Sequence, residues 1–269
     1  MQSFNKKIQA ICKNKNNRLC LGLDLDNTKL KNSSLEYMQS FILDIIDATI
    51  DLCPVYKINF AFYERHGSKG YAMLENIKDK FDDTVITIAD AKRGDIGNSS
   101  KYYATSIFKH FNFDSTTISP YMGLDSILPF TKYKNKGVFV LCLTSNQGSK
   151  DIQILKVNNC QIYKKVIDMC LKLNKNNNIG LVVGATKTSN LKDIKQKSLD
   201  LPWLIPGVGF QGGNLEDSLC VGESDNLGLA IINISRGILN AGTDGGTYGS
   251  IKDMRFASEN YTNQIRDIL

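Results

Sequence analysis

A run of alternating charges, Asp90-Ala91-Lys92-Arg93-Gly94-Asp95, follows the apolar segment Val85-Ile86-Thr87-Ile88-Ala89. Side chains two residues apart on a strand share a face, so Asp90 and Lys92 are predicted to point to the same side. A carboxylate and an ammonium held where solvent is scarce stay charged by pairing, and pairing perturbs their acidities. The run therefore indicates a candidate acid–base site, whereas an arbitrary Asp-x-Lys is more often a surface salt bridge.

The elements that would position these charges are short apolar runs bounded by polar residues or glycine, which predict strands. The eight candidate strands are Leu19–Asp24, Val55–Asn59, Val85–Asp90, Ser115–Ile118, Gly137–Leu143, Ile179–Gly184, Trp203–Pro206 and Leu229–Ile234. Helical spacing is clearest in Leu35–Leu52, where Ser33 or Ser34 can cap the first turn. Further helices are predicted near Tyr71–Phe81, Ser99–Phe108, Ile162–Leu173 and Phe256–Leu269.

Alternation of strands and helices favours an α/β fold, a (β/α)8 TIM barrel forming a single domain over residues 1–269. An open doubly wound sheet is the competing architecture. In a barrel, active sites gather at the carboxyl ends of the strands. Polar residues occur at those ends on strands one, two, three, five and eight, namely Asp24, Lys57, Asn59, Asp90, Lys92, Thr144, Ser145, Ser235 and Arg236, and strand seven ends at Pro206 before a glycine-rich stretch that includes Gln211. Their joint placement predicts one site at the barrel mouth.

The glycine-rich segment Pro206–Gly213 and the strand end at Arg236 predict a phosphate site. Glycines let backbone N–H groups approach an anion, Gln211 adds amide donors, and Arg236 offers a planar fork for phosphate oxygens. The spacing Gly207-x-Gly209-x-x-Gly212 also fits a dinucleotide fingerprint, but no acidic residue ends a following strand at the required distance. A phosphate monoester is the predicted ligand, and a flexible surface loop is the alternative.

Composition indicates the compartment and the class of partner. The seven cysteines are odd in number and form no Cys-x-x-Cys pair, which is typical of reduced thiols in a cytoplasmic protein. No signal peptide is recognisable, and no apolar run approaches the roughly 18 residues of a membrane span, so a soluble protein is expected. The scattered net charge of +6 favours small anions over nucleic acid. The polar tracts Lys13–Asn17 and Asn174–Asn178 are predicted to be solvated loops.

In their order along the chain, these residues resemble the orotidine 5′-monophosphate decarboxylase family, in the branch whose third strand ends Asp-Ala-Lys-Arg-Gly-Asp-Ile-Gly. The similarity covers nearly the whole chain and includes Leu21–Asp24, Tyr56–Asn59, Phe62-Tyr63, Asp90–Asn98, Ser119–Gly123, Thr144–Asn146, Pro206–Gly213 and Ser235-Arg236. The Asp-x-Lys-x-x-Asp core alone is shared with related sugar-phosphate barrels, whereas the ordered set is strongly specific. The segment Gln147–Cys160 matches no usable pattern.

The resemblance implies a cofactor-free, metal-free carboxy-lyase that converts orotidine 5′-monophosphate (OMP) to uridine 5′-monophosphate (UMP) and CO2, the last step of pyrimidine nucleotide synthesis. It also implies a homodimer in which Lys57, Asp90 and Lys92 form a charged network with Asp95 of the partner subunit, and Lys92 donates the proton. The implied substrate contacts are Asp24 and Asn59 near the ribose and ring, Ser145 at the pyrimidine edge, Gln211 and Arg236 at the phosphate, Ile96 and Ser99 from the partner subunit, and Thr144, Pro206 and Ser235 elsewhere in the pocket.

The chemistry accounts for these residue types. Loss of CO2 from C6 leaves electrons in an orbital that the ring π-system cannot absorb, so a nearby cation such as Lys92 must stabilise them before protonation. Asp90 and Asp95 would oppose the decrease in lysine pKa that burial imposes. Two alternatives stay open: a magnesium-dependent sugar-phosphate lyase or isomerase of the same barrel superfamily, and a non-enzymatic anion or RNA binder.

Overall fold

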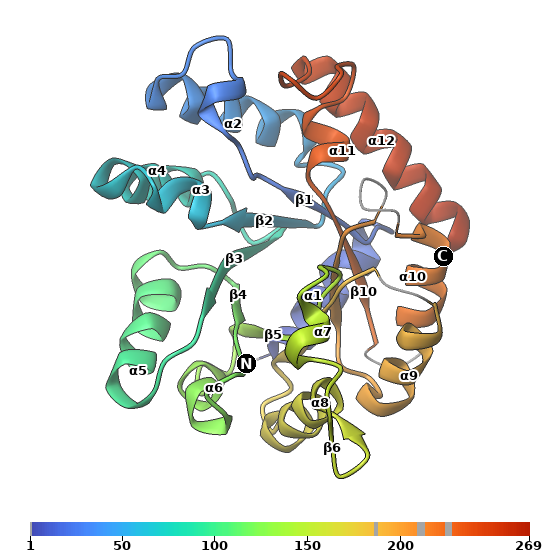
Figure 1. Ribbon diagram of the computed structural model, residues 1–269. Coiled ribbons are helices and arrows are strands. Elements are labelled where there is room, and N and C mark those ends of the chain that lie inside the picture. The colour runs from blue at the N-terminus through green and yellow to red at the C-terminus, as the bar shows by residue number, and fades with distance from the viewer. Residues whose placement is uncertain (1, 186–187, 209–212, 224–227) are drawn as a thin grey trace.

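The computed structural model describes residues 2–185, 188–208, 213–223 and 228–269, and at its centre eight parallel strands close into a barrel (Figure 1). The strands are β1 (Leu19–Gly22), β2 (Val55–Asn59), β3 (Ile86–Arg93), β4 (Ser115–Ile118), β5 (Gly137–Leu143), β8 (Ile179–Val183), β9 (Trp203–Pro206) and β10 (Ala230–Ile234). The barrel closes because β1 pairs with both β2 and β10. The predicted (β/α)8 fold class is confirmed, and the open sheet is wrong.

All eight predicted strands are present because a parallel barrel buries both faces of its strands, so that each strand is a short apolar run. β4 and β8, for example, are buried along their whole length. Two ends differ from the prediction by more than one residue. β1 stops at Gly22, which leaves Asp24 in the loop beyond it, and β3 continues past Asp90 to Arg93.

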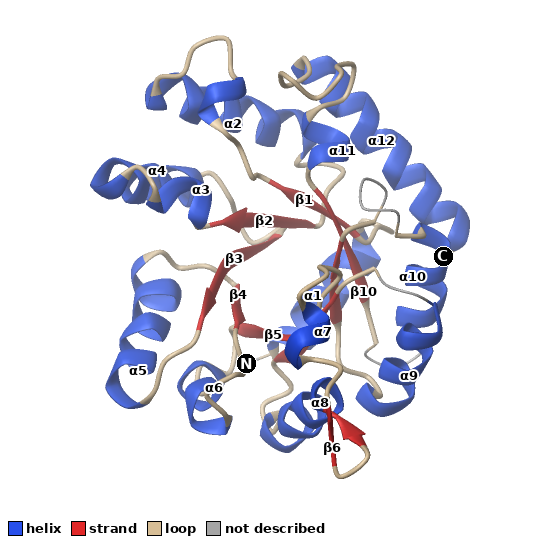
Figure 2. Ribbon diagram, viewed as in Figure 1, coloured by secondary structure: helices blue, strands red, loops and turns tan. Residues whose placement is uncertain are grey.

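Helices surround the barrel (Figure 2). They are α1 (Phe4–Asn14), α2 (Leu35–Thr49), α3 (Ala61–Glu64), α4 (Gly67–Asp79), α5 (Gly97–Thr105), α6 (Leu124–Thr131), α7 (Ser149–Ile152), α8 (Ile162–Leu173), α9 (Thr188–Ser198), α10 (Leu215–Gly222), α11 (Arg236–Leu239) and α12 (Ile251–Ile268), with short helical turns η1 (Asn27–Lys29) and η2 (Ser106–His110). The unassigned segment Gln147–Cys160 contains α7 and the start of an antiparallel hairpin, β6 (Lys156–Val157) with β7 (Cys160–Gln161).

Helix α2 shows how local sequence fixes an element. The Ser34 hydroxyl accepts a hydrogen bond from the backbone N–H of Tyr37 at 3.2 Å, as its predicted capping role requires. Ile42, Ile45 and Ile46 are fully buried on the face toward the barrel. Cap and apolar stripe together set where α2 begins and which side it presents to the barrel.

Helix α1, which the sequence did not predict, lies at the amino ends of the strands. The Asn5 side chain donates to the backbone carbonyl of Ile179 at the start of β8, at 3.1 Å. The Phe4 ring packs edge-on against Phe139 of β5, with 6.0 Å between ring centroids. A Cβ on Gly137 would come within 2.2 Å of that Phe4 ring, so glycine is required at the start of β5.

The prediction that both asparagine-rich tracts are solvated loops is wrong at Lys13 and Asn14, which end helix α1, and at Asn17 and Asn178, which are fully buried. The Asn17 amide donates to the Leu52 carbonyl and to the Thr262 hydroxyl, each at 3.0 Å. The Asn178 amide lies within 3.0–3.1 Å of three backbone carbonyls, those of Thr131, Tyr133 and Lys136. These asparagines satisfy backbone groups at chain turns, a role that composition does not reveal.

Candidate active site

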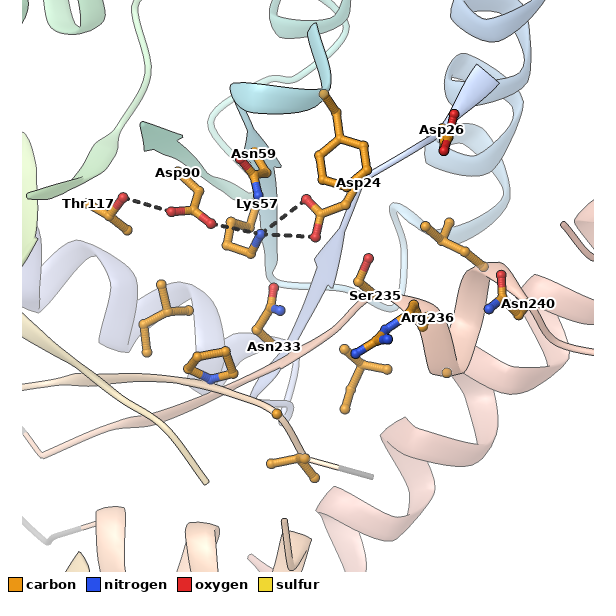
Figure 3. Close-up of a pocket in the computed structure, with 18 of the residues that line it drawn as sticks. Asp24, Asp26, Lys57, Asn59, Asp90, Thr117, Asn233, Ser235, Arg236 and Asn240 are labelled. Atoms are coloured by element: carbon orange, nitrogen blue, oxygen red, sulfur yellow. Dashed lines mark hydrogen bonds and ion pairs between the residues drawn. The ribbon is translucent and has the colours of Figure 1, made fainter. Parts of the chain in front are cut away.

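A cavity of about 510 Å3 lies at the carboxyl ends of the barrel strands (Figure 3). It brings together many of the residues predicted from the sequence, namely Asp24, Lys57, Asn59, Asp90, Lys92, Ser145, Pro206, Ser235 and Arg236. Asp95, Ile96, Ser99 and Thr144 are not part of its lining. Gln211 lies outside the described residues.

The deepest charge in the cavity is the ammonium of Lys57, whose side chain is only 5% exposed. Its Nζ lies 3.2 Å from Asp24 Oδ1, 3.3 Å from Asp24 Oδ2 and 3.2 Å from Asp90 Oδ2. Burial lowers the pKa of Lys57, but attraction to Asp24 and Asp90 outweighs burial and raises it above the ordinary value. Lys57 is therefore a fixed cation between two carboxylates.

Asp90 is the anion common to both lysines. Its Oδ2 pairs with Lys57, and its Oδ1 accepts hydrogen bonds from Lys92 Nζ at 2.6 Å and from Thr117 Oγ1 at 2.8 Å. Burial raises the pKa of Asp90, but the two lysines and these hydrogen bonds lower it overall to about 2. The carboxylate therefore stays ionised at neutral pH despite being almost completely enclosed.

Lys92 contacts Asp90 as predicted, but it does so from an irregular backbone and from a more open position. Its φ of +46° lies in the left-handed region, at a register shift between β3 and β4. Its side chain is 48% exposed, against 5% for Lys57. The expected desolvation of Lys92 is thus not supplied by this chain alone, because β3 carries Lys92 beyond the enclosed part of the cavity.

The predicted residues outside the lining lie just beyond β3 and β5. Asp95 accepts a hydrogen bond from the backbone N–H of Ile96 at 2.7 Å, while Ile96 is 55% exposed and Ser99 is also exposed. Thr144 is engaged within its own loop, since its backbone N–H donates to Gln153 Oε1 at 2.8 Å. None of these side chains reaches the cavity of this chain.

The opposite end of the cavity is built from the ends of β9 and β10. Ser235 Oγ donates to the Gly22 carbonyl at 3.1 Å, and Arg236 begins α11 next to it. A Cβ on Gly22 would meet Ser235 Cβ at 2.9 Å, so glycine at the end of β1 permits this close approach. Gly207 has φ of +92°, a conformation that glycine adopts readily. The cationic side chain of Arg236 and the glycine backbone at Gly207 thus lie in the same corner of the cavity.

Several lining residues were not predicted from the sequence. Thr117 of β4 and Asn233 of β10 lie inside the barrel, and their only signal is a polar residue within a buried strand. Asp26, Lys29, Asn240 and Tyr248 line the outer rim, where the Asp26 backbone N–H donates to the Tyr248 hydroxyl at 2.6 Å. These rim residues come from loops that carry no recognisable motif.

The part of the chain that the structure describes shows neither a metal-binding cluster nor a membrane-spanning helix. It contains no group of three or more His, Cys, Asp or Glu side chains placed to hold a metal ion. No described helix has the length and apolar character needed to cross a bilayer.

Comparison with known proteins relates both sequence and fold to one family. The sequence model of the orotidine 5′-phosphate decarboxylase / HUMPS family matches residues 17–250. An orotidine 5′-phosphate decarboxylase from Dehalococcoides mccartyi is 46% identical over 245 residues, covering 90% of each chain, and one from Flavobacterium johnsoniae is 43% identical over 235 residues, covering 84% and 85%. The solved structure of Leishmania donovani OMP decarboxylase superposes with a TM-score of 0.87 at 35% identity, covering 99% of this chain and 98% of that one.

Proposed function

Because the chain belongs to the orotidine 5′-phosphate decarboxylase / HUMPS family, we propose that its cavity converts OMP to UMP and CO2, the last step of pyrimidine nucleotide synthesis. This is the reaction of a carboxy-lyase. The observation that carries the proposal is the ion-pair network in which Asp90 binds both Lys57 and Lys92 within one cavity. Arg236 lines the other end of that cavity and suits a phosphate.

In the proposed reaction the bond between C6 and the carboxylate carbon breaks, and its electron pair stays on C6 as CO2 leaves. The Lys92 ammonium stabilises this pair electrostatically and then donates a proton from Nζ to C6. Asp90 holds Nζ at 2.6 Å and so fixes the direction from which the proton arrives. The chain supplies both charge stabilisation and the proton through this one side chain.

Lys57 keeps Asp90 in place through the reaction. Its ammonium bridges Asp24 and Asp90, and at 5% exposure water cannot easily replace either contact. We assign Asp24 and Asn59, which lie beside this network, to the ribose and the neighbouring ring. We assign Ser145, which also lines the cavity, to the pyrimidine edge, and Pro206 to a further substrate contact.

We assign the phosphate to the corner formed by Gly207, Ser235 and Arg236, with Gln211 as a further donor from outside the described residues. The guanidinium can make two parallel hydrogen bonds to phosphate oxygens. Binding energy from this nonreacting group can orient the ring over Lys92, and in that way it raises the rate of the chemical step.

We also propose that the active protein is a homodimer, in which Asp95, Ile96 and Ser99 complete the cavity of the other subunit. Support comes from their position, because none lines the cavity of its own chain. Large apolar side chains are exposed in the same region, on α5, just before it and on the loop after β4, which is typical of an interface: Ile96 at 55%, Tyr102 at 68%, Tyr121 at 81% and Met122 at 51%.

Mixing two inactive variants tests the shared sites. Lys57→Ala and Asp95→Asn subunits, allowed to exchange, should recover about a quarter of the wild-type activity, because about half of the dimers are mixed and each contains one intact site. Subunit exchange is verified by mass-tagged chains. Verified exchange without recovery would mean that each chain works alone.

The remaining assignments concern organisation and compartment. We propose that residues 1–269 act as one domain, since the eight strands form a single closed barrel. We propose a cytoplasmic location because all seven cysteines are free thiols, which is typical of a reducing compartment.

The two alternatives from the sequence are less favoured. In a magnesium-dependent sugar-phosphate enzyme, Asp24 and Asp90 would be natural ligands, but the Lys57 ammonium already occupies the space between them. An RNA-binding role is not suggested by the relatives, which are named decarboxylases.

A spectrophotometric assay tests the proposed function directly. Purified protein should change the ultraviolet absorbance of OMP as the carboxylate is lost, and the rate should be unchanged after treatment with a chelator. A folded protein that binds UMP but leaves OMP unchanged would refute the proposal. A rate that disappears with chelator and returns with Mg2+ would favour the magnesium-dependent alternative.

A further inference from the structure

Thr117 lies where strands β3 and β4 fall out of register. The pairing shifts between Ala89 and Arg93, so that residues 90–92 of β3 lie opposite only Thr117 of β4. Bulges of this kind redirect side chains and are common next to active sites. The two ends of this bulge are the charged residues of the proposed reaction, Asp90 and Lys92.

The Thr117 hydroxyl makes one hydrogen bond to each end of the bulge. It accepts from the backbone N–H of Lys92 at 3.0 Å and donates to Asp90 Oδ1 at 2.8 Å, the bond drawn in Figure 3. Because a backbone N–H can only donate, the hydroxyl must accept from it, which leaves the hydroxyl proton for the carboxylate. Thr117 is 1% exposed, so both bonds are shielded from water.

These two bonds act on the same contact. Asp90 Oδ1, which Thr117 binds, is the oxygen that receives Lys92 Nζ at 2.6 Å. Lys92 has a φ of +46°, which residues with side chains adopt only when their surroundings hold them there. Thr117 therefore holds both the carboxylate that orients the ammonium and the backbone that carries it.

We propose that Thr117 is a positioning residue for decarboxylation, whose single hydroxyl locks the Asp90 carboxylate and the Lys92 backbone into the geometry that delivers the proton. This inference rests on the proposed function and extends it to a residue that acts only through its two neighbours. Its loss should affect the chemical step far more than the binding of the nucleotide, because Arg236 and the phosphate corner remain intact.

The adjacent residue provides a matched control. Thr116 is on the same strand, is fully buried, and its hydroxyl donates to the Ala89 carbonyl of β3 at 2.9 Å, but it does not line the cavity. Thr116→Val and Thr117→Val are thus the same substitution, and each removes buried bonding to β3. Only Thr117→Val removes a bond to the charged network.

The experiment compares kcat and KM for OMP in the two valine variants and in Thr117→Ser. Thr117→Val should lower kcat by about 10- to 100-fold, the range expected on removing a hydrogen bond to a charged group, with little change in KM. Thr117→Ser should restore most of kcat, and Thr116→Val should keep wild-type kcat. If Thr117→Val does not fold, Thr117→Ala takes its place.

Equal losses of kcat in the two valine variants, or a wild-type kcat in Thr117→Val, would overturn the proposal. Crystal structures of the same variants separate it from the proposed function. If the wild-type protein does not act on OMP, the function fails, but Thr117 is still tested: the Lys92–Asp90 contact should be displaced or lost in Thr117→Val and kept in Thr116→Val. An undisturbed contact in Thr117→Val would contradict the positioning role.

Discussion

Lys57 and Lys92 bind the same carboxylate under very different conditions. Lys57 is 5% exposed and lies between two carboxylates, whereas Lys92 is 48% exposed and, among the residues that the structure describes, pairs with Asp90 alone. The same chain supplies both carboxylates that surround Lys57. Lys92 lies at the edge of the cavity, where substrate and, under the proposed function, a partner subunit would enclose it. We therefore expect Lys57 to contribute mainly to the stability of the fold, and Lys92 mainly to the reaction.

The largest expected effect is the loss of catalytic rate on replacing Lys92. Lys92→Ala should lower kcat by about 10^4-fold or more, because it removes the side chain proposed both to donate the proton and to stabilise the carbanion. Affinity for UMP, measured by calorimetry, should stay near the wild-type value since Arg236 is untouched. Loss of UMP binding together with loss of secondary structure would instead assign Lys92 a structural role.

The next effect is on stability. Lys57→Ala should lower the free energy of unfolding by about 3 kcal/mol or more, because Asp24 and Asp90 are left enclosed with too little positive charge. Lys92→Ala, which removes a half-exposed partner, should cost about 1 kcal/mol or less. Urea unfolding of both variants measures the difference.

Lys57→Met serves as the control for packing, since it keeps the apolar stem of the side chain. A loss similar to that of Lys57→Ala would assign the effect to the missing charge. Equal stability of Lys57→Ala and Lys92→Ala would show that the two environments do not differ energetically.

The smallest effect is a pH dependence carried by Asp90. Its pKa falls from an ordinary 3.8 to about 2 in the folded chain, so the folded state holds the ionised form. This contribution, about 2 kcal/mol, is fully present above about pH 4 and is lost as the pH falls toward 2. Urea unfolding across this range should show a shallower decline for Asp90→Asn than for the wild-type protein. Parallel declines would mean that Asp90 titrates alike in the folded and unfolded chains.

The sequence was sufficient for the barrel but only partly for the site. Short apolar runs located every barrel strand because full burial leaves a simple signature. The strand-end rule found Lys57 and Asp90, whose charges stand out against apolar neighbours. Thr117 was missed because a threonine within a strand reads as an ordinary β-former, and its importance depends on a register shift. Regular strand alternation predicted the contact between Lys92 and Asp90. It did not predict that the Lys92 side chain is half exposed, because this exposure also depends on the register shift.

Helix α1 closes the end of the barrel that lies opposite the cavity. Its residues Phe4 and Ile8 pack in one apolar layer with Val182 and Leu204, and those two also form the inner wall of the cavity. This apolar layer closes the barrel at its amino end, and the cavity lies at the carboxyl ends of the strands. Under the proposed function, CO2 and UMP would leave through the carboxyl end of the barrel, where OMP also enters.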